Sequence, residues 1–163
     1  FTLLLEKSPK YRGVFLSLLV EVLNHSLTEE FLFSRLDYYQ QMLTELDEPH
    51  EKYFDMLRKF MANRSHFLLE EIQEALQLSG PFDFTLSIPS DAEVLVDGHK
   101  YSRNYEGHYF TSTAVELQIP EDKKNKFSHW LLNGKKETGI RLQIELTKAT
   151  QVSAVFENSI RYQ

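Results

Sequence analysis

The chain changes its pattern abruptly at Gly80-Pro81, and this change constrains the fold more than any other feature. Before it, apolar residues recur at the three- and four-residue spacing of a helix, most clearly over residues 53–78. After it, short segments alternate apolar and polar residues, as strands do. The sequence therefore predicts an α+β fold in two segregated parts: an antiparallel α-helical bundle over residues 1–80 and a small antiparallel β-sandwich or barrel over residues 82–158.

Three helices are predicted in the first part. Ser8-Pro9 is typical of a helix start, because serine caps free amides and proline fits the first turn. A second helix follows Ser26 or Thr28, and a third begins at Pro49, with a break or kink expected at residues 62–65. The buried faces are predicted from apolar residues at helical spacing: Tyr11, Val14, Phe15, Leu18, Leu19 and Val22; then Leu32, Leu36, Tyr39, Leu43 and Leu46; then Tyr53, Phe54, Leu57, Phe60, Met61, Leu68, Leu69, Ile72, Ala75 and Leu76.

The second part contains six predicted strands, separated by turn signals. The strands are expected at residues 83–88, 92–96, 108–112, 115–119, 141–146 and 152–156. Asp97-Gly98 and Asn133-Gly134 favour tight hairpins, because these residue types tolerate positive φ angles. Trp130 and Phe110 lie in alternating segments, so we expect them in the core.

Composition excludes several classes of protein. With 163 residues, 42% of them hydrophobic, the chain can bury a substantial core. Its net charge of -6 and lack of a basic stripe argue against a nucleic-acid-binding surface. The absence of cysteine excludes disulfides, thiolate metal sites and cysteine nucleophiles. No apolar run is long enough to span a bilayer, so we expect no membrane span.

No complete catalytic or metal-binding motif is found. The chain has neither a glycine-rich phosphate loop nor a nucleophile elbow. His66 and Glu70 have the i, i+4 spacing of two metal ligands on one helix face, but two ligands are too few to predict a metal site. Tyr101 and Tyr105 are candidates for a ligand surface, since aromatic rings offer apolar faces with polar edges to sugars and peptides. Catalytic, cofactor-binding and metal residues are therefore not predicted.

The helical part resembles the C-terminal helices of the CotH family, the spore-coat-protein-H-like kinases. The matching segments are residues 7–12 (KSPKYR) with Phe15, residues 23–28 (LNHSLT), and residues 57–60 (LRKF) followed by Asn63-Arg64. Two features depart from the family pattern: Ser65 replaces the usual proline after Arg64, and the connector around Pro49-His50 is short.

The β part resembles the small divergent internalin-B-type repeats of bacterial surface proteins. The matching segments are residues 94–98 (VLVDG), 105–110 (YEGHYF), 115–117 (VEL), 127–130 (FSHW) with Asn133-Gly134, and 152–156 (VSAVF). A module of this kind is plausible as an appendage to a surface protein.

These resemblances imply a function for the whole. CotH-like proteins are atypical protein kinases whose nucleotide and magnesium ligands lie upstream of the matching helices, so the parent protein is expected to use ATP and Mg²⁺ and this chain to hold no cofactor. The first residue is Phe1 rather than methionine, and we expect the chain to come from a longer protein. The implied role is the non-catalytic C-terminal region of a bacterial extracellular or cell-surface protein. The helices would support an upstream kinase-like domain, and the β module would be a spacer or adhesion unit. The alternative is a module that binds a glycan or protein at the cell surface.

Overall fold

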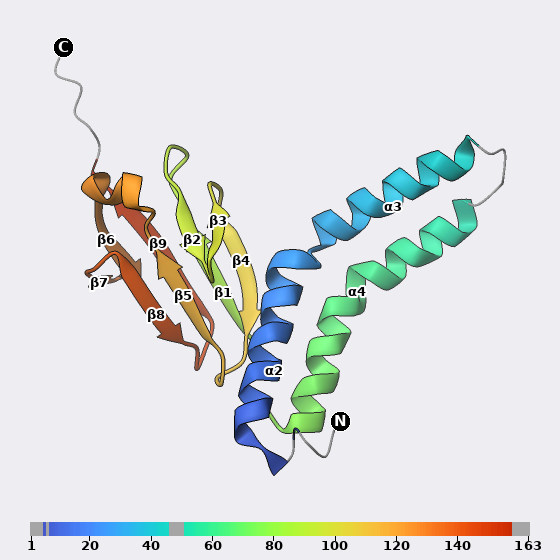
Figure 1. Cartoon of the computed structure of the whole chain (residues 1–163), viewed down its shortest axis with the longest axis horizontal. Coiled ribbons are helices and arrows are strands. Elements are labelled where there is room, and N and C mark those ends of the chain that lie inside the picture. The colour runs from blue at the N-terminus through green and yellow to red at the C-terminus, as the bar shows by residue number, and fades with distance from the viewer. Residues whose placement is uncertain (1–4, 6, 46–50, 158–163) are drawn as a thin grey trace.

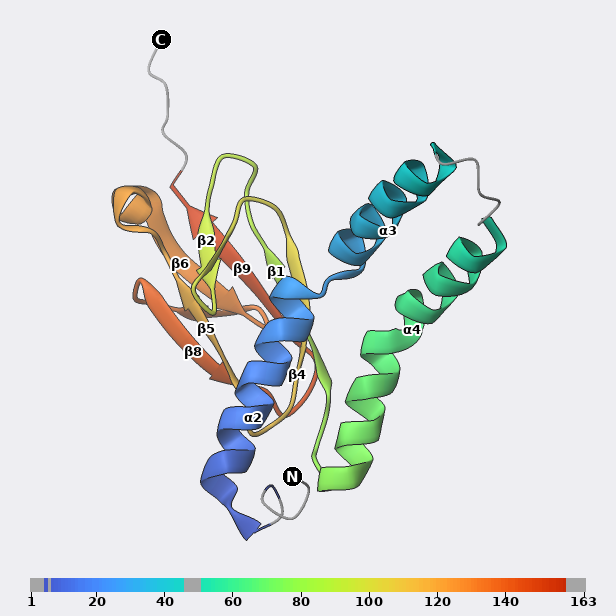
Figure 2. The same cartoon turned by 45° about the vertical axis from the view of Figure 1, so that its right-hand side comes forward.

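The computed structural model describes residues 5, 7–45 and 51–157. Its helical part comprises α2 (Pro9–Glu21), the π-helical turn η1 (Val22–Ser26), α3 (Glu29–Thr44) and α4 (Glu51–Leu76). α3 and the first half of α4 form an antiparallel pair that projects away from the strands (Figure 1). α2 lies between the strands and the second half of α4, an arrangement that is also visible after rotation (Figure 2).

The helix starts agree with the sequence signals where the structure describes them. Pro9 opens α2 as predicted, but the Ser8 side chain makes no capping hydrogen bond there. The Thr28 hydroxyl caps α3 by accepting a hydrogen bond from the Phe31 amide at 3.3 Å. α4 continues as a helix through residues 62–65, so the predicted break is wrong, although the helix bends near its middle (Figure 1). The predicted start at Pro49 and the predicted core residue Leu46 lie outside the described residues.

The second part is a two-sheet module, which confirms the predicted α+β fold with segregated helices and strands. One sheet has the strand order β4-β1-β9-β6-β7 and the other β3-β2-β5-β8. All pairs are antiparallel except β1 with β9, which run parallel. The described strands are β1 (Phe82–Ser87), β2 (Val94–Val96), β3 (His99–Tyr101), β4 (Tyr105–Tyr109), β5 (Ala114–Gln118), β6 (Phe127–Leu132), β7 (Lys135–Glu137), β8 (Arg141–Glu145) and β9 (Thr150–Phe156), with a 3-10 turn, η2 (Glu121–Lys126), before β6.

The two dipeptide turns are the hairpins that the sequence predicts. Asp97-Gly98 joins β2 to β3 and Asn133-Gly134 joins β6 to β7, each as a two-residue loop. All four residues have positive φ angles, between 48° and 85°. Non-glycine residues rarely adopt this conformation, and Asn and Asp are among the few that do so readily. The six predicted strands undercount the nine described ones, because β3, β6 and β7 are missed. β3 and β7 are short and carry no apolar alternation. The strand predicted at residues 108–112 is displaced from β4, which runs from Tyr105 to Tyr109.

A continuous apolar core joins the sheets to the helices. Trp130 and Phe110 are fully buried, as predicted, and the Trp130 indole N–H donates to the Gly139 carbonyl at 2.9 Å. The same cluster of buried residues includes Leu16, Val20 and Leu23 of α2 and η1, and Leu69 and Leu76 of α4. The helices therefore contribute to the core that the sandwich closes.

Half of the predicted helical face points to solvent instead. The exposed residues of the predicted faces include Tyr11, Val14, Leu18, Val22, Tyr39, Tyr53, Leu57 and Phe60. The buried residues include Leu36 and Phe54, which were predicted, and Leu16, Val20 and Leu23, which were not. The prediction was wrong at the exposed positions because each helix carries two apolar stripes, and spacing alone does not say which one meets the core. We call ten of the exposed residues the outer stripes: Tyr11, Val14, Leu18 and Val22 of α2 and η1; Phe31, Tyr38 and Met42 of α3; and Met56, Phe60 and Phe67 of α4.

A pair of leucines tests which face of α2 is buried. Leu16 is 0% exposed and Leu18 is 56% exposed. Leu16→Ala is expected to lower the free energy of unfolding by about 2–5 kcal/mol, because it leaves a cavity, and Leu18→Ala to change it by less than about 0.5 kcal/mol. Urea unfolding of both variants measures this difference. Equal effects, or the reverse order, would contradict the packing described above.

Candidate functional site

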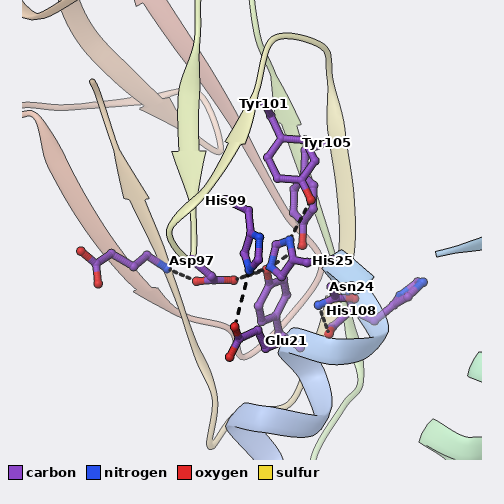
Figure 3. Close-up of polar contacts among 10 residues, drawn as sticks. Glu21, Asn24, His25, Asp97, His99, Tyr101, Tyr105 and His108 are labelled. Carbon is purple, nitrogen blue, oxygen red and sulfur yellow. Dashed lines mark hydrogen bonds and ion pairs between the residues drawn. The ribbon is translucent and has the colours of Figure 1, made fainter. Parts of the chain in front are cut away.

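A polar cluster lies where η1 meets the β module (Figure 3). It contains His25 of η1, Asp97 of the β2–β3 turn, His99 and Tyr101 of β3, and Tyr105 and Tyr109 of β4. We call these six residues the His25 cluster. Its members are joined by hydrogen bonds and ring stacking, and they come from segments more than 70 residues apart in the chain.

The His25 side chain is the centre of this cluster and is 0% exposed. Its Nδ1 atom lies 2.7 Å from the Tyr101 hydroxyl, and its Nε2 atom lies 3.2 Å from Asp97 Oδ2. The ring is stacked on His99 at 4.4 Å and on Tyr105 at 5.4 Å, with interplanar angles of 13° and 10°. Since an ionised carboxylate only accepts hydrogen bonds, Nε2 donates to Asp97, and Nδ1 accepts from Tyr101 in the neutral imidazole.

Asp97 accepts three hydrogen bonds inside this junction. Besides His25, the Tyr109 hydroxyl donates to Oδ2 at 2.7 Å and the Glu116 amide donates to Oδ1 at 2.8 Å. Burial alone would raise the pKa of the Asp97 carboxyl, but the bonds from His25, Glu116 and Tyr109 outweigh it and hold the pKa below its ordinary value of 3.8. Asp97 is therefore ionised at neutral pH and serves as the acceptor on which the cluster converges.

Two tyrosines of β4 complete the chain of donors. The Tyr105 and Tyr109 hydroxyl oxygens lie 2.8 Å apart, and because Tyr109 donates to Asp97, Tyr105 donates to Tyr109. Burial first, and the Asp97 charge in addition, raise the pKa of both phenols far above the ordinary value of 10. Gly107 lies between them on the same face of β4. A Cβ atom at Gly107 would lie 2.5 Å from the Tyr105 hydroxyl, so glycine is required for the two rings to meet.

Asn24 attaches the same turn to the edge of a sheet. Its side-chain amide donates to the His108 carbonyl at 3.0 Å and accepts from the His108 amide at 3.1 Å, as a neighbouring strand would. β4 is an edge strand, and Asn24 covers part of this edge. Asn24-His25-Ser26 fits the acceptor pattern for N-glycosylation, but the side-chain amide of Asn24 is buried and hydrogen-bonded to His108, which makes it a poor acceptor.

The structure brings the two predicted ligand-surface residues together, with ring centroids 4.7 Å apart. Tyr101 is partly exposed, but Tyr105 is only 4% exposed. Tyr101 borders a hollow of about 430 Å³ that is also lined by Arg103, Asn104 and Glu30. The sequence predicts no site role for His25 or His99, offers Tyr109 only as one of several aromatic residues of a possible ligand platform, and identifies Asp97 only as a turn residue. The available signal was the Tyr-x-Gly-x-Tyr pattern of residues 105–109, in which glycine separates two rings on one face.

His66 and Glu70 form a pair at 3.1 Å on the exposed surface of α4. They line a hollow of about 660 Å³ between α4 and the edge of the β module, which also contains the pair His108 and Asp83 at 3.1 Å. Within residues 5, 7–45 and 51–157, no group of three or more His, Asp or Glu side chains is placed to hold a metal ion.

Comparisons of the chain with protein-family models, with curated proteins and with solved structures each gave no match. In the part of the chain that the structure describes, no helix is both long enough and apolar enough to cross a membrane. These comparisons therefore assign no role to the residues of the His25 cluster. Chemically, the cluster is a fixed imidazole with a carboxylate on one side and a phenol on the other.

The lowered pKa of Asp97 predicts a pH dependence. A carboxyl whose pKa is lower in the folded than in the unfolded state stabilises the fold above about pH 4, and this stability is lost as the pH falls below that value. Asp97→Asn is expected to reduce the free energy of unfolding at pH 7 by about 1–3 kcal/mol and to flatten its acid dependence. Urea unfolding between pH 3 and 7 measures both effects, with Asp55→Asn on the exposed face of α4 as control. An unchanged acid slope in Asp97→Asn would contradict the assignment.

Alanine substitutions at two glycines are expected to change the free energy of unfolding in opposite directions. Gly107→Ala is expected to cost about 1–3 kcal/mol, because the methyl group collides with Tyr105 and Tyr109. Gly13→Ala in α2 meets nothing within 4 Å and is expected to stabilise by about 0.4–1 kcal/mol, because alanine favours the helix. Thermal unfolding of the two variants checks the signs. An unchanged Tm in Gly107→Ala would show that the Tyr105 and Tyr109 rings can move apart without loss of stability.

Proposed function

We propose that this chain is the non-catalytic C-terminal region of a CotH-like atypical protein kinase. In this proposal the helices pack on an upstream kinase-like domain of the same protein, and the β module is a spacer or adhesion unit at a bacterial cell surface. The observation that carries it is the outer stripes, which leave a second apolar face on each helix without cover from the described residues. ATP and Mg²⁺ would bind to the upstream domain.

The spacing of the outer stripes supports a packed interface. In α2 and η1 they recur at residues 11, 14, 18 and 22, and in α4 at 56, 60 and 67, which places each set on one side of its helix. Large apolar residues exposed along one side of a helix commonly mark a surface that a partner covers. Arginines add to the stripes: Arg35 lies 5.6 Å from the rings of Tyr38 and Tyr39, and Arg64 lies 5.7 Å from Phe60. Arginine and aromatic residues are enriched where proteins meet.

The His25 cluster supports the spacer role. It fixes η1 to the β2–β3 hairpin through polar contacts of the buried His25 side chain, and Asn24 adds two hydrogen bonds to the edge strand β4. A β module held in this way keeps a fixed orientation relative to the helices. Anything that binds the helices would therefore place the β module in a defined direction.

The second candidate is a module that binds a glycan or a protein. The observation that favours it is the hollow beside Tyr101, where an aromatic ring, an amide and charged groups converge. A ligand screen on the whole chain, using shifts in Tm, separates the two. Binding that Tyr101→Ala removes would favour this candidate over the spacer role.

The docking proposal predicts a selective loss of association. Phe60→Glu places a charge in an outer stripe and is expected to shift the Tm of the chain by less than about 2 °C, because an exposed residue contributes little to the fold. It is expected to weaken binding to the separately produced kinase-like domain at least tenfold, measured by calorimetry. Gln41→Glu, at an exposed polar position of α3, is the control and is expected to bind normally.

A titration with ATP and Mg²⁺ tests the assignment of catalysis to the upstream domain. The chain alone is expected to give no binding heat, whereas a longer polypeptide that includes the kinase-like domain binds the nucleotide. Nucleotide binding by the chain alone would overturn the non-catalytic role. Equal association of Phe60→Glu and the unaltered chain would overturn the docking surface.

A further inference from the structure

Three side chains of the His25 cluster lie in the order of a nucleophile, a base and an orienting acid. The Tyr101 hydroxyl is 2.7 Å from His25 Nδ1, and His25 Nε2 is 3.2 Å from Asp97 Oδ2 (Figure 3). Hydroxyl nucleophiles of enzymes are activated by a base within about 2.6–3.2 Å that a third group holds in place. The structural role proposed above uses the Tyr101 hydroxyl only as a hydrogen-bond donor to His25, although Tyr101 is partly exposed and borders a hollow.

We propose that Tyr101 is a nucleophilic tyrosine and a site of covalent acyl modification, with His25 as the base that removes its proton. The donor class is an uncharged activated ester. The modification is a single transfer to the protein, which is compatible with a chain that has no catalytic turnover of its own.

The base is organised before any reaction. Asp97 accepts from Nε2 and thereby selects the tautomer in which Nδ1 is free to take a proton from Tyr101. His99 and Tyr105 stack on the two faces of the imidazole and restrict its rotation. Asp97 is held in turn by Tyr109 and the Glu116 amide. Groups that are fixed in this way need little rearrangement to reach the reactive geometry.

The phenol needs this base. Burial first, and then the Asp97 charge, raise the pKa of Tyr101 above its ordinary value of 10, while Arg103 acts in the opposite direction. The hydroxyl is therefore protonated at neutral pH, and the reaction requires removal of the proton as the new bond forms. His25 is the group in position to do this.

The hollow beside Tyr101 defines the donor. It has a volume of about 430 Å³, and its charged lining consists of Glu30, Glu106 and Arg103. Arg103 is paired with Glu30. The uncompensated charge is thus negative, which disfavours phosphoryl donors and leaves a neutral ester as the compatible electrophile. The Arg103–Glu30 pair is exposed on both sides, and such pairs are weak, so it presents little barrier to entry.

The transfer balances without a further reactant. The Tyr101 oxygen attacks the carbonyl carbon of the ester as the phenol proton passes to His25 Nδ1. The bond from the carbonyl carbon to the leaving phenol of the activated ester breaks, and the departing phenolate takes the proton from the imidazolium. The products are an acyl ester on Tyr101, the free phenol of the donor and neutral His25.

The test uses the whole chain and p-nitrophenyl acetate near neutral pH, with release of nitrophenol followed by absorbance and adducts mapped by mass spectrometry. Tyr101 is expected to be acetylated at least tenfold faster than Tyr11 and Tyr38, although these are 58% and 56% exposed. This comparison is internal to one protein, so it does not depend on the folding of any variant. Equal labelling of the three tyrosines would overturn the proposal.

Three variants test the roles proposed for Tyr101, His25 and Asp97 in the acyl transfer. Tyr101→Phe keeps the ring, and is expected to remove the fast phase of nitrophenol release while circular dichroism stays unchanged. His25→Gln and Asp97→Asn are expected to slow acetylation of Tyr101 at least tenfold without changing the labelling of Tyr11. A fast phase that survives in Tyr101→Phe, or a Tyr101 rate that is unchanged in folded His25→Gln, would overturn the nucleophile or the base respectively.

Discussion

The carboxylate of Asp97 is the contact on which the junction of helices and strands depends. It lies in a two-residue turn with positive φ, so the backbone itself directs it back over β2 and β5, where it accepts from the Glu116 amide. From the other side it accepts from His25 and Tyr109. An unpaired buried carboxylate would be costly, and these donors satisfy it. The three donors, His25, Tyr109 and Glu116, belong to three different elements. Hydrogen bonds to this one carboxylate therefore fix η1 and β4 against the β2–β3 hairpin.

The sequence predicts the β module better than the helical packing, for a physical reason. Dipeptides such as Asn133-Gly134 specify a turn through local backbone sterics, and a two-residue period leaves only one choice of buried face. The helices offer two apolar faces, as Leu16 and Leu18 show, and local chemistry does not choose between them. That choice is made by the sandwich, through contacts with residues far along the chain.

The candidate site was predicted only in part. The sequence singles out Tyr101 and Tyr105 as aromatic residues near turns. Both contact the His25 ring, but His25 is 76 residues from Tyr101 in the chain. A lone histidine in a helical segment has no local signal that distinguishes a buried junction from solvent. The π-helical turn that presents Asn24 and His25 in succession to the strands is equally invisible to a pattern based on 3.6-residue periodicity.

The point where the sequence changes pattern is not where the packing ends. Gly80 has a φ of +111°, and a Cβ atom there would lie 3.1 Å from the Tyr109 carbonyl, so the connection is pressed against β4. The Ser79 carbonyl accepts from the Thr111 amide at 3.0 Å, which ties the end of the helical part to the following strand region. Since Leu16, Leu69 and Leu76 belong to the same buried cluster as the sheet residues, rotation of the β module about this connection would expose apolar surface from both parts. The connection is therefore a packed joint rather than a hinge, and a surface that engages the helices also sets the direction in which the strands point.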